Sequence, residues 1–116
     1  MKLLRFLLAL LPLTFWPTGG EAKPRMARCA INSQGAPVYR GPCLFVAEPK
    51  GSFTIRPAAQ RQFAGVTSIS LSVVDPGVGE VRGLTSDGIN SRWGEARRSR
   101  RNRACWQGSD FSICVY

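Results

Sequence analysis

The sequence predicts an all-β fold: a small antiparallel barrel or sandwich with two disulfides, preceded by a signal peptide. Three observations support this prediction. About eight short stretches of strand-forming residues are separated by turn residues, as in barrels and sandwiches. Four cysteines, an even number, follow an apolar leader. The whole chain has 116 residues, which corresponds to one domain.

Residues 1–22 have the pattern of a secretory signal peptide. Lys2 and Arg5 give it a positive start, residues 3–13 are nearly all apolar, and small residues precede a cleavage position after Ala22. The apolar run is too short to span a bilayer with ease, which argues against a membrane anchor. We therefore expect a periplasmic or secreted protein with no transmembrane segment after processing.

The mature chain is expected to have a flexible basic lead-in at residues 23–28 and a single disulfide-held β domain at residues 29–116. Without Lys2, Arg5 and Glu21, it keeps 14 Lys and Arg against 6 Asp and Glu, a net charge of +8. A chain of this size buries only about 60–65% of its unfolded surface, so disulfides add needed stability. We expect a monomer whose partner is an anionic envelope polymer or an acidic protein. The signal peptide makes nucleic acid a less favoured partner.

Each expected strand lies between two turn signals. Glycine accepts positive φ and proline fixes φ, so clusters of Gly, Pro, Asn and Asp mark the turns. In chain order, turns are expected at 33–37, 48–51, 75–77, 85–88 and 109–110, and a loop at 57–65. The strands between them are expected at 29–32, 38–39 continuing to 43–46, 52–56, 66–74, 78–84, 89–93, 104–106 and 111–115.

The stretch at residues 66–74 is the clearest strand. Ile69, Leu71 and Val73 alternate with serines, so the apolar side chains share one face and the hydroxyls share the other. This period of two is typical of an antiparallel strand with one buried face.

The four cysteines allow three disulfide connectivities. Cys29 and Cys43 lie symmetrically about the turn at 33–37, and Cys105 and Cys114 lie symmetrically about residues 109–110. A hairpin at each turn would bring the sulfurs within bonding distance. The sequence therefore favours Cys29–Cys43 and Cys105–Cys114.

No set of catalytic or metal-binding residues is found. The chain has no His, which removes the usual general base and the common catalytic triads. No Cys-x-x-Cys spacing indicates a zinc or redox site. No spacing nominates the paired carboxylates that a glycosidase needs. We predict a protein that is not an enzyme, with no cofactor and no metal.

Five arginines lie within the seven residues 97–103. One interpretation is a solvated loop, since blocks of like charge usually are that. A second is an anion-binding loop, because guanidinium groups bind phosphate and carboxylate in bidentate fashion. A third, a nuclear or nucleic-acid-binding patch, is disfavoured by the signal peptide, although extracellular DNA stays a possible partner. The expected anion-binding residues are Arg92, Arg97, Arg98, Arg100, Arg101 and Arg103.

Polar residues surround a single large ring in the segment at 90–94. Asn90, Ser91 and Trp93 are a candidate partner loop that would insert into the cleft of another protein. The alternative is that Trp93 packs inward, because protruding Trp side chains are uncommon on monomers.

The chain resembles the periplasmic inhibitors of C-type lysozyme in four features. These are its signal peptide, its domain size, its short strands and the segment Cys105-Trp106-Gln107-Gly108 followed by Cys114. The resemblance implies a small β-barrel of the bacterial envelope. Those inhibitors block the lysozyme cleft with a Ser-Gly-x-x-Tyr loop, and the nearest stretch here, residues 86–90, has no matching Tyr. Both this chain and lysozyme are basic, which would oppose docking. No residue is carried over as an inhibitor site. The chain also resembles short exported proteobacterial proteins of no assigned role.

These observations favour an exported, non-enzymatic binding protein of the cell envelope that meets an anionic partner through the Arg-rich loop. The alternative is an inhibitor of a secreted hydrolase that acts through the segment at residues 90–94. A small carboxylate-dependent hydrolase is a third, minor option.

Overall fold

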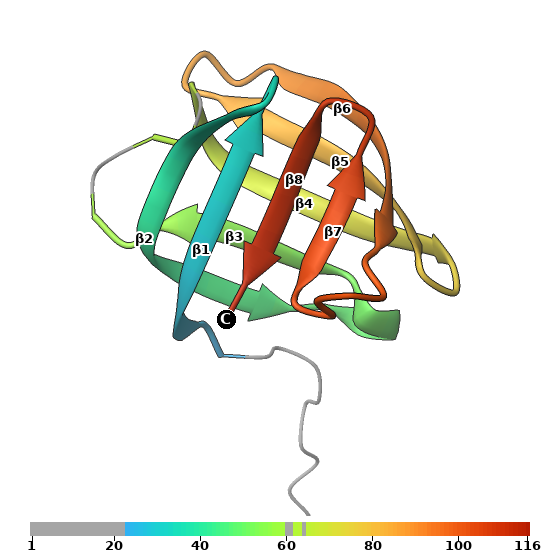
Figure 1. Ribbon diagram of the computed structural model, residues 1–116. Coiled ribbons are helices and arrows are strands. Elements are labelled where there is room, and N and C mark those ends of the chain that lie inside the picture. Colours follow the sequence, from blue (N-terminus) through green and yellow to red (C-terminus); the bar gives the residue numbers. More distant parts are fainter. Residues whose placement is uncertain (1–22, 60–61, 64) are drawn as a thin grey trace, which may run out of the picture.

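The computed structural model describes residues 23–59, 62–63 and 65–116, and these form a closed barrel of antiparallel strands (Figure 1). Each strand pairs with the next one in the chain, and the last pairs with the first. The elements are β1 (Arg25–Ser33), β2 (Ala36–Ala47), the 3-10 turn η1 (Pro49–Gly51), β3 (Phe53–Pro57), β4 (Val66–Asp75), β5 (Val78–Thr85), β6 (Asn90–Arg98), β7 (Cys105–Gly108) and β8 (Phe111–Val115). The all-β prediction is confirmed, and of its two architectures the barrel is the one observed.

The N-terminal boundary differs from the expected one. The expected signal peptide, residues 1–22, lies outside the described residues. β1 begins at Arg25, so the expected lead-in at 23–28 is wrong from that residue on. Arg25 pairs with Phe45 of β2, and Ala27 is buried while Arg25 and Arg28 are exposed. These basic residues resemble a loose lead-in in the sequence, and their pairing with β2 makes them a strand.

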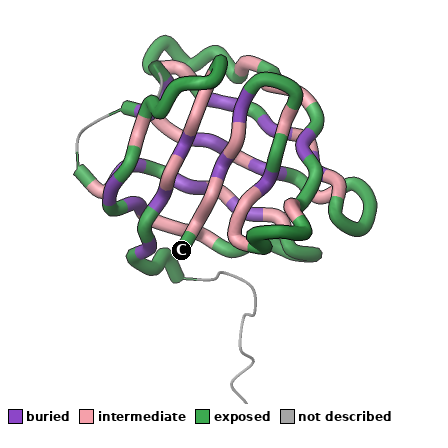
Figure 2. The backbone as a smooth tube through the Cα atoms, in the orientation of Figure 1, coloured by how far each residue is buried: buried purple, intermediate pink, exposed green. Residues whose placement is uncertain are grey.

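The buried residues, which recur along the strands in Figure 2, are apolar, and their side chains form the core of the barrel. The predicted alternation in β4 is confirmed: Ile69 and Leu71 are buried, and Val73 packs against the core. A barrel of eight strands is just wide enough for side chains to fill its interior. Because side chains occupy the interior, the outer wall and the two ends of the barrel are the surfaces open to solvent. The largest fully buried side chains are Phe63, Ile31, Ile55, Ile69, Leu71, Ile113, Val81 and Cys43.

Both predicted disulfides are confirmed. Cys105 and Cys114 lie directly opposite each other on β7 and β8, with Ser109 and Asp110 forming the turn between the strands. Cys29 and Cys43 are joined diagonally, because Cys29 lies opposite Gly41 in the β1–β2 register. Both cysteines of this diagonal disulfide belong to the core, since Cys29 is 2% exposed and Cys43 is fully buried.

The diagonal follows from the first turn, which is tighter than expected, and from a register shift between Ile31 and Asn32. Gln34 and Gly35 alone connect β1 to β2, with φ values of 54° and 80°. Two successive positive φ angles are those of a type I′ turn, whose twist matches that of the flanking strands.

The two ends of the barrel carry different connections. One end holds the turn at Gln34, the loop after β3 and the turns before β6 and β8. From that loop Phe63 packs fully buried into the core, edge to face against Tyr39 with 4.6 Å between ring centroids. The other end holds η1, the β4–β5 turn and the β6–β7 loop, which gather at the lower right of Figure 1. No helix within the described residues has the length and apolarity needed to cross a membrane.

Candidate functional site

An open cavity lies at the end of the barrel where η1, the β4–β5 turn and the β6–β7 loop meet, and we call this end the basic end. The cavity has a volume of about 340 Å³, within the range of about 300–1,000 Å³ that is usual for small-molecule sites. Residues of all three connections line it: Lys50, Gly51, Val73, Pro76, Gly77, Arg98, Ser99, Arg100, Arg103 and Trp106.

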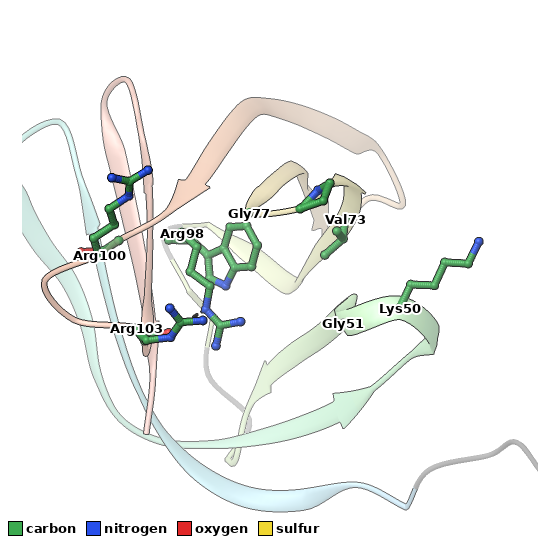
Figure 3. A pocket seen from close by; sticks show the side chains of 10 residues that line it. Lys50, Gly51, Val73, Gly77, Arg98, Arg100 and Arg103 are labelled. Carbon is green, nitrogen blue, oxygen red and sulfur yellow. Dashed lines mark hydrogen bonds between the residues drawn. The ribbon is translucent and has the colours of Figure 1, made fainter.

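Positive charge dominates this cavity. Four of its lining residues are cations, Lys50, Arg98, Arg100 and Arg103, and none is acidic (Figure 3). The two ion pairs among the described residues involve other arginines. In Figure 3 the side chains of Lys50 and Arg100 extend outward on opposite sides, whereas Arg98 and Arg103, which a hydrogen bond joins, lie in the middle. Positive potential is therefore expected to be strongest at Arg98 and Arg103, where a bound anion would relieve their repulsion. The cavity is therefore suited to a negatively charged group.

An aromatic ring forms part of the wall below these charges. Trp106 is 4% exposed, and Arg98 lies over its indole with 5.5 Å between Cζ and the ring centroid. The Arg98 Nε–H also donates a hydrogen bond of 2.8 Å to the backbone carbonyl of Arg103. The cation–π contact and the hydrogen bond together hold the guanidinium plane at the mouth of the cavity.

The β6–β7 loop, residues 99–104, is ordered by its own polar side chains. Ser99 Oγ accepts hydrogen bonds of 3.2 Å from the N–H groups of Arg101 and Asn102. Asn102 Oδ1 accepts one of 3.1 Å from the N–H of Ala104, and Asn102 Nδ2 donates one of 2.8 Å to the Tyr116 hydroxyl. These bonds favour one loop conformation, and such preorganisation lowers the entropy cost of binding.

A second cavity, of about 280 Å³, adjoins the first. Phe45 and Phe53 lie in its wall with their ring centroids 5.3 Å apart, and the Cζ atom of Arg25 lies 4.5 Å from the Phe45 centroid. Arg25 and Arg98 bring two cations to this second cavity beside its apolar side chains. Its lining residues are Arg25, Phe45, Gly51, Phe53, Arg98, Ala104, Trp106 and Val115.

The expected Arg-rich loop is partly a strand. β6 continues to Arg98, so the loop begins at Ser99 and not at residue 97. Successive side chains of a strand point to opposite faces. Ala96 is buried, so Arg97 points outward and Arg98 returns to the inner side at the mouth of the barrel. The strand extends because residues 94–97 pair with β5. The charged residues of this segment show no apolar alternation from which the strand could be predicted.

The six predicted anion-binding arginines therefore separate into groups. Arg98, Arg100 and Arg103 line the first cavity, whereas Arg101 belongs to the same loop but not to the lining. Arg92 pairs with Glu80 at 3.0 Å and Arg97 pairs with Glu95 at 3.2 Å, both away from the cavity.

Sequence reasoning missed two cations of the basic end, Lys50 and Arg25. They are distant from the Arg run in the chain, and the closure of the barrel brings them to it. Lys50 has a φ of 64° within η1, which is the left-handed region of backbone conformation. The turn expected at residues 48–51 was the one sequence signal for this conformation.

The strand expected at residues 89–93 is confirmed as part of β6, and the interpretation of the same segment as an exposed partner loop is wrong. Asn90, Ser91 and Trp93 belong to β6, and Ser91 Oγ donates a hydrogen bond of 2.9 Å to the Gly83 carbonyl. Trp93 packs against the core with its ring edge to face on Phe111, at 5.5 Å between centroids. The inward alternative for Trp93 is confirmed, and no contact of this segment favours the hydrolase-inhibitor alternative.

No group of three or more His, Cys, Asp or Glu side chains that could hold a metal gathers within the part of the chain that the structure describes. The predicted absence of an enzymatic activity stays a prediction. What the basic end offers chemically is binding: guanidinium and ammonium donors above aromatic side chains.

Comparison with known proteins gives no relative for this chain. No family model matches it, and no match is found among the curated proteins or the solved structures. The resemblance to the periplasmic inhibitors of C-type lysozyme therefore stays a prediction. The functional argument depends on the geometry of the chain itself.

Proposed function

We propose that this protein is an exported, non-enzymatic binding protein of the cell envelope, which binds an anionic partner at its basic end. One observation carries the proposal: four cations line one cavity that has no acidic lining residue. Two disulfides support a periplasmic or extracellular location, because such bonds persist in oxidising compartments.

The chemistry of the cations favours an anionic group with several acceptor oxygens. A guanidinium group presents parallel N–H donors that match phosphate and carboxylate. Arg98 already has its plane fixed over Trp106, and the backbone on either side of Arg100 is held by the bonds of the loop. The donors are thus partly oriented before a partner arrives, which reduces the ordering that binding requires.

The net charge of residues 23–116 supports the same partner class over longer range. A charge of +8 attracts polyanions and raises their rate of association at low ionic strength. Exposed charges further apart than about 8 Å are screened at physiological salt. We expect the overall charge to govern the rate of encounter and the cavity to govern how long the complex lasts.

Binding to lipopolysaccharide, a phosphate-bearing envelope polymer, tests the proposal. The Arg100→Ser/Arg103→Ser double variant removes two charges from the cavity, and Arg92→Ser/Arg97→Ser removes two from the ion-paired outer wall. We expect the first to weaken binding by about tenfold or more, as loss of charge-assisted bonds does. The second should change affinity by less than about threefold.

Comparing the two double variants distinguishes binding at the cavity from a general effect of net charge. Equal losses in the two double variants would mean that lipopolysaccharide senses only net charge, and the proposed site would be wrong. Absence of binding to lipopolysaccharide, dextran sulfate and acidic proteins at low salt would contradict the function itself.

A further inference from the structure

Arg98 is the cation that the two cavities of the basic end share. It lines both of them, whereas Arg103 lines only the first and Arg25 lines only the second. These three residues come from β6, from the loop after it and from the start of β1. Their guanidinium groups therefore follow one another across the basic end in the order Arg103, Arg98, Arg25, and we call this set the arginine row.

Aromatic rings position two members of the arginine row. The Cζ atom of Arg25 lies 4.5 Å from the centroid of Phe45, and the Cζ atom of Arg98 lies 5.5 Å from the centroid of Trp106. A guanidinium group stacked on a ring turns one face to it and keeps the N–H donors of its edge for other partners. Trp106 is buried and Phe45 is covered by Arg25, so the rings orient the cations and offer no separate apolar surface.

The charges of the arginine row are not compensated by acids. No acidic residue lines either cavity, and the two ion pairs among the described residues involve other arginines. Arg25, Arg98 and Arg103 are all exposed. Arg98 uses its Nε–H for the carbonyl of Arg103, which leaves its two Nη groups as donors. Lys50 and Arg100 extend outward on opposite sides in Figure 3, so they lie outside the row.

We propose that the arginine row binds a linear chain of linked phosphates, with successive phosphate groups at Arg103, Arg98 and Arg25. This inference rests on the proposed function and names the ligand class of the same site. A single phosphate occupies one cavity and reaches Arg98 and one of its neighbours. A chain that enters both cavities reaches all three guanidinium groups. Its later contacts form within the complex, so each of them adds to the affinity without a new loss of translational freedom.

The chemistry of linked phosphates matches this arrangement. Every unit of such a chain is charged, and its paired oxygens fit the parallel donors of a guanidinium group. An acidic peptide also has repeated charges, but each of its carboxylates lies on a side chain that has to be ordered on binding. The adjoining cavities are open at the barrel end, and an open cationic groove suits a linear polyanion.

Calorimetric titration of the disulfide-bonded protein tests the inference. The probes are inorganic phosphate, diphosphate, tripolyphosphate and tri-aspartate, in magnesium-free buffer at constant ionic strength. We expect affinity to rise with the length of the phosphate chain and tripolyphosphate to bind at least about tenfold more tightly than inorganic phosphate, as added charge-assisted contacts predict. Tri-aspartate should bind more weakly than tripolyphosphate.

Matched single variants separate the arginine row from net charge. Arg25→Ser should remove most of the gain that comes with chain length and change the affinity for inorganic phosphate by less than about threefold, because that anion is expected at Arg98 and Arg103. Arg101→Ser removes the same charge from a residue that lines neither cavity, so it should preserve the gain. Arg25→Lys keeps a cation and an aliphatic chain over Phe45, and it should retain part of the gain. This conservative variant keeps the test valid if Arg25→Ser does not fold.

The outcomes distinguish this inference from the proposed function. Equal gains with chain length in Arg25→Ser and Arg101→Ser would mean that the phosphates sense only net charge, which overturns the arginine row as a site. Tri-aspartate that binds as tightly as tripolyphosphate overturns the phosphate chain in favour of an acidic peptide. Failure of all phosphates while lipopolysaccharide still binds also overturns it, and failure of every anion contradicts both proposals.

A further probe identifies the source of the phosphate chain. Adenosine triphosphate that binds as tightly as tripolyphosphate would show that the phosphate end of a larger molecule is sufficient. Weaker binding of adenosine triphosphate would identify a free phosphate chain. Either result supports the inference, because both ligands present successive phosphates to the arginine row.

Discussion

Arg98 and Trp106 are stacked on each other across the β6–β7 pair, with 5.5 Å between the Arg98 Cζ and the centroid of the indole ring. The two residues are direct partners in the register of these strands. Arg98 also binds the Arg103 carbonyl through Nε, so one side chain joins the barrel wall, its aromatic residue and the loop that carries the other cations. The contact is the structural centre of the basic end.

Replacing Arg98 by Ala should expose Trp106 and lower the free energy of unfolding by about 0.5–1 kcal/mol, the usual value of such a contact at an accessible site. In a Trp93→Phe background, Trp106 is the single Trp of residues 23–116. Its emission should move to longer wavelength, and acrylamide should quench it more strongly. Arg97→Ala is the control, because Arg97 pairs with Glu95 and points away. Unchanged quenching in Arg98→Ala would mean that the stacking is absent in solution.

Replacing Asn102 by Ala should loosen the loop without unfolding the barrel. The change removes the acceptor for the Ala104 N–H and the donor to the Tyr116 hydroxyl. Hydrogen exchange at the amides of residues 99–104 should become faster, while exchange in β4 and β5 stays slow, because loops open with lower free energies than core strands. Affinity for anions should fall even though no charge is lost. An Asn102→Ala variant with unaltered exchange would show that these bonds do not order the loop.

The two disulfides should differ in their reactivity. Cys29 and Cys43 are buried in the core, whereas Cys105 and Cys114 are half-buried and open to attack. A small thiol reductant under native conditions should therefore reduce Cys105–Cys114 first, because thiol exchange needs access to the sulfur. Alkylation of the free thiols followed by mass spectrometry shows which disulfide is reduced first. Reduction of Cys29–Cys43 at the same rate would indicate that the barrel opens readily.

Loss of either disulfide should also lower stability by a predictable amount. Cys29–Cys43 closes a loop of 14 residues and Cys105–Cys114 one of 9. In the chain-entropy model, each bond contributes about 2–3 kcal/mol, with the longer loop contributing slightly more. Urea unfolding of the two double Cys→Ala variants measures both contributions. The first variant should lose more than the model value, since it also leaves a cavity in the core.

Replacing Gly83 by Ala should destabilise the barrel through Trp93. A Cβ atom at Gly83 would lie 2.8 Å from Trp93 Nε1 and 2.9 Å from Val66 Cγ1, closer than such atoms pack. Overpacking of this kind costs about 1–3 kcal/mol. Trp93→Phe removes the indole nitrogen, so it should rescue part of the loss, and thermal unfolding of the two single variants and the double variant measures the coupling. Additive effects would mean that Gly83 matters for a reason other than the space it leaves for Trp93.

The strand pattern and the disulfides were predictable because both depend on short stretches of sequence. The alternation of Ile69 and Leu71 with serine identifies a strand locally, and each pair of cysteines brackets its own turn. The end of β6 was not predictable. Its last residues, Arg97 and Arg98, have no apolar pattern, and the sheet that they join is formed with partners on β5 and β7.

The candidate site was predictable only in part. Local charge density identified Arg98, Arg100 and Arg103, which line the first cavity, but it weighted Arg92 and Arg97 equally. The difference depends on which face of β6 each side chain occupies and on where Glu80 and Glu95 lie. Lys50 and Arg25 carry no signal of their own, because they join the site only after the barrel closes.

The sequence by itself determined a small β domain, its turns, its two disulfides and an excess of positive charge, because these depend on composition and on neighbours in the chain. Only the tertiary structure decided that the barrel closes, that Trp93 packs inward and that cations from η1, β6 and the following loop surround one cavity beside aromatic residues. The physical reason is that barrel closure aligns the ends of strands that are distant in sequence. No local pattern encodes which side chains then share a space.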